Sequence, residues 1–224
     1  MKIVTINELR FLIRNDADLR VCKEILEKNT YQKTKLGFSI KPKEVWIDCG
    51  CNIGVFAVWA EKVKGAIVYG FEACEENAQI ANYNLQLNKC KSKIFTGFIK
   101  SVGTGTSKIV FNERTPARSS PFSKGVMRCV PNYSLNEAIS KYKPNGLKID
   151  IEGGEFDLLD NGINVNGLNS LVIEYHFLFN KDTKLARKRI KPLMESFKNN
   201  SIHKNVLEQD QWNSWQDSVF YFWN

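Results

Sequence analysis

The sequence predicts an α/β fold built around a mostly parallel sheet. Short apolar runs alternate with amphipathic segments of helical periodicity through the first half of the chain. Two of these runs end in an acidic residue, Asp48 or Glu72, and the first continues into a glycine-containing turn. A strand–helix rhythm of this kind favours parallel strands joined by right-handed crossovers.

The first 44 residues are expected to form a helical lid segment that packs on one core domain at 45–224. Residues 6–28 are interpreted as helical, because four apolar residues share one helical face: Leu19, Cys22, Ile25 and Leu26. Asp16 or Asp18 can cap this helix. Residues 31–43 are interpreted as irregular, with a short strand near 38–40.

The core elements follow in order. Strands are expected at 45–48, 67–71, 93–98, 108–111, 146–151, 168–173, 202–207 and 218–223, and helices at 55–64, 75–87, 134–142, from 156, and at 183–199, with a loop at 112–129. Gly65 ends the first of these helices, and Ser134 with Glu137 forms a capping box for the third. Asp182 is the expected N-cap of the last helix, and Pro192 is expected to kink it. The final two strands suit an antiparallel hairpin.

Composition restricts the class of protein. A chain of 224 residues with 43% hydrophobic and 25% charged residues is typical of one soluble domain. No apolar run approaches the roughly 20 residues of a membrane span, and the N-terminus turns polar too early for a secretion signal. We therefore expect a cytoplasmic protein. The net charge of +8 suggests an anionic partner, although a basic surface can also serve solubility alone.

The six cysteines and two histidines do not form a metal-binding pattern. No Cys-x-x-Cys pair occurs, so a structural zinc site is not expected. Cys49 and Cys51 are too close within a turn for an unstrained disulfide. We interpret the cysteines as small buried thiols in a reducing compartment.

The turn at 48–54 indicates a cofactor site. Gly50 and Gly54 allow a tight turn that approaches a ligand, and the helix that follows presents its free N–H groups there. The turn lacks both the three-glycine dinucleotide pattern and the P-loop ending. Asp48 at its head opposes a pyrophosphate and suits a cationic ligand, which favours S-adenosylmethionine over NAD.

Glu72 is expected to bind the ribose of the cofactor. It follows the glycine turn by about twenty residues and ends the next strand, where an acid can accept hydrogen bonds from both ribose hydroxyls. A solvated loop acid is the alternative, and the placement after a buried strand favours ribose.

Three stretches together resemble the FkbM family of S-adenosylmethionine-dependent methyltransferases. They are the turn with its strand at 47–54, Phe71-Glu72 followed by Asn82 and Asn88, and Leu147-Lys148-Ile149-Asp150-Ile151-Glu152-Gly153-Gly154-Glu155 at 147–155. The third stretch is the most specific, and the resemblance covers about residues 38 to 176. Cys51 and Ala73 depart from the alanine and proline that are common in the family.

The resemblance implies a Rossmann-like class I methyltransferase. Its seven-stranded, mostly parallel sheet would have an antiparallel last strand and helices on both faces, and it would transfer methyl groups to oxygen. The residues that we expect at the cofactor are Asp48, Gly50, Asn52, Gly54, Glu72, Ala73, Ile99, Lys100 and Asp150.

A neutral hydroxyl acceptor needs a base or a metal ion to become a good nucleophile. The catalytic candidates are Asp150, Glu152, His176 and Lys148, and Glu155 is a further candidate base. We favour Asp150 or Glu152 as the base or as the group that aligns the acceptor. His176 is as well explained by a structural role. A divalent metal on Asp150, Glu152 and Glu174 is a third option and is not expected.

The acceptor is expected to contact Glu155, Glu174, Arg118 and Tyr133. Tyr133, Tyr175, Trp212 and Trp215 can stack on a sugar ring, although such aromatics more often belong to the core. We favour a sugar hydroxyl on a glycan or glycoside, for instance on a deoxyhexose such as rhamnose.

Two other functions stay open. The basic residues at 184–191 and 114–128 support an RNA-directed enzyme of the cap 2′-O type, although nucleic acid is not the favoured partner and this helix is more simply a solvated face. A non-catalytic cofactor-binding module is the other alternative. The complete set Asp48, Glu72, Asp150 and Glu152 argues against it.

Overall fold

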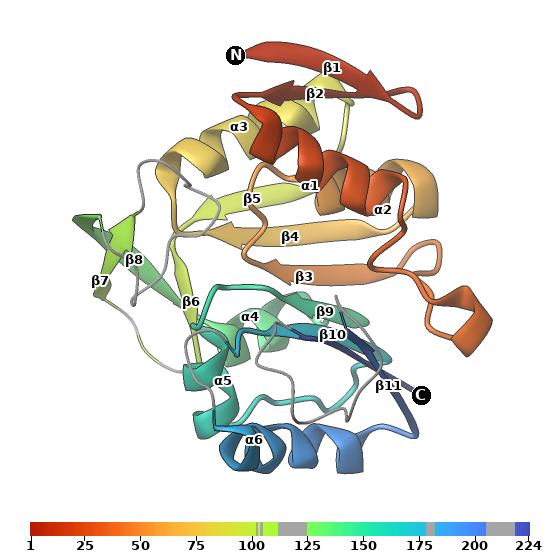
Figure 1. Cartoon of the computed structure of the whole chain (residues 1–224), viewed down its shortest axis with the longest axis vertical. Coiled ribbons are helices and arrows are strands. Elements are labelled where there is room, and N and C mark those ends of the chain that lie inside the picture. The colour runs from red at the N-terminus through yellow and green to blue at the C-terminus, as the bar shows by residue number, and fades with distance from the viewer. Residues whose placement is uncertain (102, 104, 112–124, 178–181, 205–217) are drawn as a thin grey trace.

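A mixed seven-stranded sheet forms the centre of the computed structural model (Figure 1), which describes the chain except for residues 102, 104, 112–124, 178–181 and 205–217. The strand order is β11 (Asn199–Lys204), β12 (Ser218–Trp223), β10 (Ser170–Tyr175), β9 (Gly146–Ile149), β3 (Val45–Cys49), β4 (Ile67–Glu72) and β5 (Lys93–Thr96). Neighbouring strands from β10 through β5 are parallel. β12 runs antiparallel to both β10 and β11. The predicted α/β class is therefore confirmed.

Helices cover both faces of this sheet (Figure 1). One set is α1 (Asp16–Leu26), α2 (Val55–Lys64) and α3 (Glu75–Leu87), and the other is α4 (Leu135–Tyr142), α5 (Glu155–Asn161) and α6 (Thr183–Ser196). Each set packs on its own hydrophobic cluster. The adjacent residues Trp46 and Ile47 enter different clusters, because successive side chains of a strand point to opposite faces.

The N-terminal segment begins with a hairpin, and its second strand lies within residues 6–28, which were predicted to be helical. β1 (Lys2–Ile6) pairs antiparallel with β2 (Leu9–Ile13), and Asn7 and Glu8 form the turn with φ of 49° and 67°. Leu9, Phe11 and Ile13 are buried in alternation, which is the period of a strand. The helical prediction is therefore wrong for 6–13 and correct for α1.

Asn15, and neither of the predicted aspartates, caps α1. Its side chain accepts hydrogen bonds from the N–H groups of Ala17 and Asp18. Asp18 is buried and forms an ion pair with Arg14 at 2.9 Å. A short 3₁₀ helix, η1 (Thr34–Leu36), follows in the segment that was expected to be irregular.

A small second sheet extends the carboxyl edge of the central sheet. Its order is β6 (Phe98–Lys100), β8 (Val126–Ser134) and β7 (Thr106–Phe111). The predicted strand at 93–98 divides at Gly97, where a Cβ atom would lie 2.5 Å from the Tyr133 ring. The predicted loop at 112–129 is wrong at its end, because 126–129 belong to β8 and pair with β7.

The helix boundaries coincide with glycines of positive φ and with N-cap residues. α2 lies between Gly54 and Gly65, both with positive φ, and Ser134 and Asp182 cap α4 and α6 as predicted. α6 contains Pro192 and ends at Ser196, before the predicted 199. Val63, in the last turn of α2, is 51% exposed. None of the helices in the described part of the chain is both long and apolar enough to cross a bilayer.

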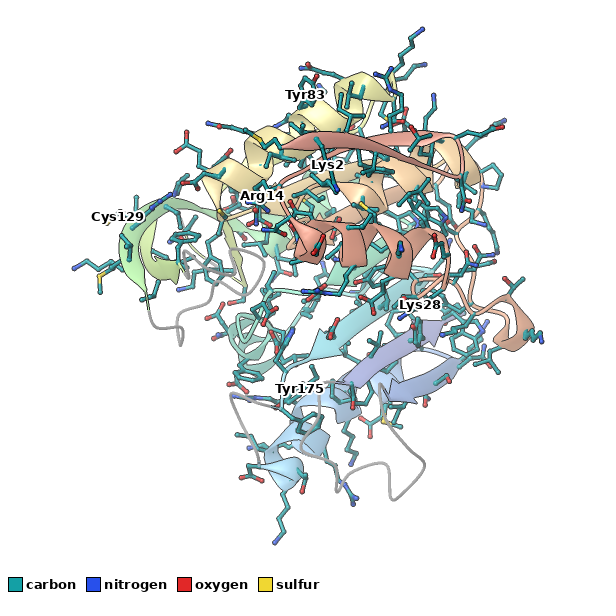
Figure 2. The ribbon with its side chains drawn as sticks, turned by 45° about the horizontal axis from the view of Figure 1, so that its top comes forward. Lys2, Arg14, Lys28, Tyr83, Cys129 and Tyr175 are labelled. Carbon is teal, nitrogen blue, oxygen red and sulfur yellow. The ribbon has the colours of Figure 1, made fainter. Side chains whose placement is uncertain are left out.

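The thiols differ strongly in exposure. Cys22, Cys49, Cys51 and Cys74 are buried, and burial raises the pKa of Cys74 to about 12. Cys129 is exposed on β8 (Figure 2), so the prediction of buried thiols is wrong for this residue.

We expect a disulfide reagent at about pH 8 to label Cys129 first, because a thiol with a high pKa has little reactive thiolate. Mass spectrometry of peptides taken at early times checks this order. Cys129→Ser should remove the fast phase. Equally fast labelling of Cys74 in the folded protein would contradict the burial described here.

Candidate functional site

The acidic residues predicted to converge lie at one edge of the central sheet. Asp48 lies in β3 and Glu72 ends β4, while Asp150 follows β9 and Glu174 lies near the end of β10. These strands are parallel and in register, so their carboxyl ends share this edge. In open parallel sheets, this is the edge at which ligands bind.

Two glycines bring the turn at 48–54 close to its neighbours. Gly50 has φ of 82°, and a Cβ atom there would lie 1.8 Å from the backbone oxygen of Asp150. Gly54 has φ of 79° and caps α2, and its Cβ would lie 3.0 Å from Ala81. Only glycine fits such positions without displacing backbone. The first motif therefore packs directly on the turn after β9.

Asp48 and Lys148 form a buried ion pair beneath the turn. Lys148 Nζ donates to Asp48 Oδ1 at 2.8 Å and to the Gly50 carbonyl at 3.3 Å, and both side chains are at most 3% exposed. Burial disfavours the ammonium, but Asp48 and Asp150 outweigh it and raise the pKa of Lys148. Lys148 therefore stays protonated and holds the turn in place. It is not free to act as a base.

Tyr31 joins the N-terminal segment to the same group of charges. Its hydroxyl donates to Asp150 Oδ2 at 3.2 Å, and its ring lies 5.1 Å from Lys148 Nζ. Sequence reasoning missed Tyr31, because it precedes Asp150 by 119 residues and lies in a segment without a motif. No local pattern signals this contact.

Glu72 is held rigidly by the backbone around it. Its two carboxylate oxygens accept from the N–H of Asn52 at 2.8 Å and the N–H of Cys74 at 2.9 Å. Burial raises the pKa of Glu72, and these N–H donors counteract the increase. Oε1 also accepts from the Asn77 side-chain amide at 3.5 Å. A carboxylate has about four lone-pair sites, so Oε2, with Asn52 as its one donor among the described residues, can accept a further hydrogen bond.

His176 is oriented by Glu155, which is completely buried. Its Nδ1 lies 3.1 Å from Glu155 Oε1, and Glu155 also accepts from the N–H groups of His176 and Gly153. Burial disfavours the imidazolium, but Glu155, Asp150 and Glu152 outweigh it and hold the pKa of His176 well above its ordinary value. In this state, His176 is a cation among carboxylates and a poor proton acceptor.

The other ring nitrogen of His176 faces the carboxylates at the open edge. Nε2 lies 3.8 Å from Asp150 Oδ1 and 3.6 Å from Glu152 Oε2, and these acids are 26% and 22% exposed. One ligand atom each from Asp150, Glu174 and His176 lies within 4.8 Å of the others. The group with metal-ligand spacing thus contains His176, whereas the sequence analysis named Glu152 beside the two other acids.

Several residues expected at the acceptor have packing roles. Glu155 has no exposure and uses both oxygens for hydrogen bonds within the protein, so it cannot reach an acceptor directly. The Tyr133 ring packs on Phe71 and Phe95. Tyr175 is buried, and its hydroxyl accepts from Arg189. Arg118, Trp212 and Trp215 lie outside the described residues.

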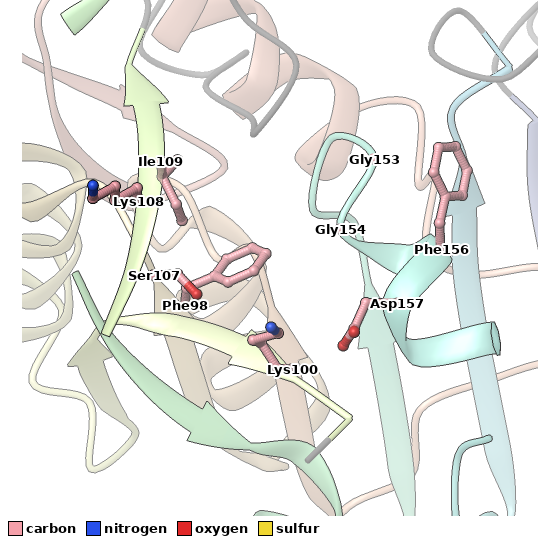
Figure 3. A pocket seen from close by; sticks show the side chains of 9 residues that line it. All are labelled: Phe98, Lys100, Ser107, Lys108, Ile109, Gly153, Gly154, Phe156 and Asp157. Carbon is pink, nitrogen blue, oxygen red and sulfur yellow. The ribbon is translucent and has the colours of Figure 1, made fainter. Parts of the chain in front are cut away.

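A cavity of about 280 Å³ opens between the small sheet and the turn after β9 (Figure 3). Phe98, Ile109 and Phe156 provide apolar walls, and Lys100 and Asp157 line it from β6 and α5. Of the other residues expected at the cofactor, Ile99 is buried in the core and Ala73 packs against the small sheet. The cavity meets the turn after β9 at Gly153 and Gly154, and its described lining residues do not include the turn at 48–54.

A family model described as the methyltransferase FkbM domain matches residues 48–204, which is more than half of the chain. The chain belongs to the FkbM methyltransferase family. The match contains the turn at 48–54, Glu72, and the carboxylates and histidine at the ends of β9 and β10. Tyr31 lies before it. A sequence comparison with curated proteins gave no match.

Solved structures with a similar chain path include other methyltransferases. The precorrin-6y C5,15-methyltransferase of Geobacter metallireducens GS-15 is 10% identical, with a TM-score of 0.46 over 99% of this chain and 95% of that one. TYW2 of M. jannaschii in complex with AdoMet is 13% identical, with a TM-score of 0.47 over 99% and 84%. TrmK of M. capricolum with S-adenosyl-homocysteine is 12% identical, with a TM-score of 0.44 over 85% and 66%.

Proposed function

We propose that this FkbM-family protein is an S-adenosylmethionine-dependent O-methyltransferase whose acceptor is a sugar hydroxyl. The observation that carries the proposal is the acidic edge of the sheet. Asp150, Glu152 and Glu174 lie there, partly exposed, next to the glycine turn and Glu72.

The residues at this edge fit a cationic cofactor. Six carboxylates lie at this edge (Asp48, Glu72, Asp150, Glu152, Glu155 and Glu174), and the cations Lys148 and His176 lie within 4.0 Å of four of them, namely Asp48, Asp150, Glu152 and Glu155. Oδ2 of Asp48 is also buried without a hydrogen-bond partner among the described residues. Because Lys148 already neutralises Asp48, the attraction for a sulfonium comes from the whole group.

Glu72 and the cavity account for the nucleoside part of the cofactor. Oε2 of Glu72 has capacity for a ribose hydroxyl, and its weaker Asn77 contact at 3.5 Å on Oε1 can give way to the second one, as is usual for an acid that ends the second strand of such a sheet. The cavity starts at β6, directly after the next strand, and its apolar walls with Lys100 and Asp157 suit an adenine base.

The charge at the reacting edge favours a sugar over RNA. Carboxylates accept hydrogen bonds from sugar hydroxyls, whereas they repel the phosphates of a nucleic acid. In the basic helix α6, Arg189 forms an ion pair with Asp160 and donates to the Tyr175 hydroxyl. This arginine therefore serves the fold, and the helix offers less charge to a nucleic acid than its sequence suggests.

The chemistry requires an acceptor oxygen placed in line with a methyl group. S-adenosylmethionine supplies that methyl on a sulfonium. We assign proton acceptance to Glu152 and alignment of the acceptor to Asp150, whose carboxylate is oriented by the Tyr31 hydroxyl. Lys148 and His176 stabilise the carboxylates as cations. Positioning of this kind supplies a large part of the rate in group transfer.

Transfer of labelled methyl from S-adenosylmethionine to a panel of glycosides and capped RNA tests the proposal. We expect product from a glycoside that includes deoxyhexoses, and none from RNA. Glu152→Gln should lose turnover while calorimetry finds most of its cofactor affinity retained. Product from capped RNA alone would reverse the choice of acceptor, and calorimetric silence of the wild-type protein would refute the cofactor.

We expect Tyr31→Phe to lower kcat by about fivefold, because loss of one hydrogen bond worth about 1 kcal/mol leaves Asp150 less well oriented. The Michaelis constant for S-adenosylmethionine should change little, since Tyr31 contacts Asp150 and not the glycine turn. Steady-state kinetics with both substrates measures this separation.

Tyr221→Phe is the matched control for Tyr31→Phe. Its hydroxyl donates to the Thr30 carbonyl, so it binds the same N-terminal segment without reaching Asp150. Equal loss of kcat in the two variants would mean that Tyr31 acts only by packing the segment.

A further inference from the structure

Three side chains at the ends of β9 and β10 have the spacing of ligands of one metal ion. Asp150 follows β9, and Glu174 and His176 stand two residues apart at the end of β10, so they share one face of the strand. One carboxylate oxygen from each acid and one ring nitrogen lie within 4.8 Å of one another. Parallel pairing of Ile149 with Ile173 brings the two strand ends level.

Glu155, which lies outside this group, orients the His176 ring in the way that metal-binding histidines are usually oriented. Glu155 has no exposure, and its Oε1 lies 3.1 Å from His176 Nδ1. The N–H groups of Gly153 and His176 fix that carboxylate in turn. A histidine that binds a metal through one nitrogen usually donates the other N–H to a buried carboxylate or carbonyl, which sets its tautomer and ring orientation.

The distances from His176 Nε2 to the nearby carboxylate oxygens also suit side chains that surround one ion. They are 3.8 Å to Asp150 Oδ1 and 3.6 Å to Glu152 Oε2, longer than the usual hydrogen-bond length of about 3 Å. Ligands that each lie about 2.1 Å from one ion stand about 3 to 4 Å apart. One imidazole with several carboxylates is a donor set suited to Mn²⁺.

We propose that Asp150, Glu174 and His176 bind one divalent cation of the Mn²⁺ type, with Glu152 beside it. The ion would take the place of the proton on His176 Nε2, so the metal-free protein carries the imidazolium and the metal-bound protein the neutral ring. Asp150 is 26% exposed, so the ion keeps coordination positions open to the solvent side, where an acceptor oxygen can bind. This role towards the acceptor rests on the proposed function. The binding of the ion does not.

Electron paramagnetic resonance of Mn²⁺ added to chelator-treated full-length protein tests the site. We expect one bound ion per chain and a nitrogen coupling that changes when the histidines carry the other nitrogen isotope. The chain has only two histidines, so His203→Gln should keep the coupling and His176→Gln should lose it. Mn²⁺ bound without nitrogen coupling in the wild-type protein would overturn the proposal, as would the absence of binding.

A pair of variants separates the metal from the cofactor. Glu174→Gln should weaken Mn²⁺ binding at least about tenfold and lower calorimetric affinity for S-adenosylmethionine only slightly, because five of the six carboxylates near the sulfonium remain. Glu72→Gln should weaken binding of S-adenosylmethionine and leave Mn²⁺ affinity unchanged. If the wild-type protein binds Mn²⁺ but not S-adenosylmethionine, the proposed function is refuted and the metal site is not. If Glu174→Gln binds Mn²⁺ as tightly as the wild type, the metal site is refuted and the proposed function is not.

Discussion

Replacing Lys148 with methionine is expected to lower the free energy of unfolding by about 3–5 kcal/mol. The substitution keeps much of the side-chain volume but leaves the Asp48 carboxylate without its partner in a site with no exposure. Removing one member of a buried pair costs far more than removing both, because the remaining charge has lost its compensation. Denaturant unfolding followed by circular dichroism measures the change.

The double variant Asp48→Asn with Lys148→Met is expected to recover most of this loss, since it leaves no buried charge. Lys184→Met, at an exposed position in α6, should stay within about 0.5 kcal/mol of wild type. A deficit that persists in full in the double variant would mean that packing, and not charge, is lost in Lys148→Met.

The deficit of Lys148→Met also has a predictable pH dependence. Burial already raises the pKa of Asp48 while Lys148 opposes the increase, so removal of Lys148 raises that pKa further. An acid with a raised pKa in the folded state costs nothing below its unfolded pKa of about 3.9, and its full cost appears above the folded pKa. The deficit should therefore grow as the pH rises from about 4.

Glu72→Gln is expected to weaken binding of S-adenosylmethionine by about 10- to 100-fold. Hydrogen bonds to a charged acceptor contribute about 1.5–3 kcal/mol, and an amide loses both the charge and one of the two acceptor oxygens. Isothermal titration calorimetry of the purified protein measures the affinity. The amide keeps one oxygen for either Asn52 or Cys74, so the variant retains part of the local support.

Glu75→Gln is the control for Glu72→Gln. Glu75 is exposed at the start of α3, three residues away, and should leave the affinity unchanged. Thermal unfolding of Glu72→Gln distinguishes a lost ligand contact from a loosened turn. Wild-type affinity in a folded Glu72→Gln would remove Glu72 from the cofactor site.

The N-terminal segment shows where reasoning from periodicity failed. Leu19, Cys22, Ile25 and Leu26 correctly predict α1, since helical spacing is a local property. Extending that helix back to residue 6 overlooked the alternation from Leu9 to Ile13, which satisfies the period of a strand. The alternation typical of a strand was present in the sequence, but the stronger helical pattern of the next residues was extended over it.

The small sheet could not be predicted from its own residues. The first four residues of β8, 126–129, are all exposed, so this part shows no hydrophobic alternation. It forms a strand because β7 pairs with it along one edge. Strand formation in such a segment depends on a distant partner, and sequence-local reasoning has no access to that partner.

The ion pair with Lys148 changes the role that the sequence suggested for Asp48. As a residue at the head of a glycine turn, it suggests direct attraction for a cationic ligand. In the folded protein, Lys148 neutralises it from the neighbouring strand, and the register that pairs these two residues explains why. The excess negative charge instead comes from acids at the ends of β9 and β10.

The core strands, the helices α2 and α3 and the glycine turn were predictable from the sequence, because each depends on residues that are neighbours in the chain, and three short motifs were enough for the family. The roles of the charged groups were not predictable in this way. Lys148 became an internal cation, Glu155 became the support of His176, and Tyr31 joined the site across 119 residues. A side chain's charge partner and exposure are set by the packing of distant segments, and these two quantities determine its chemistry.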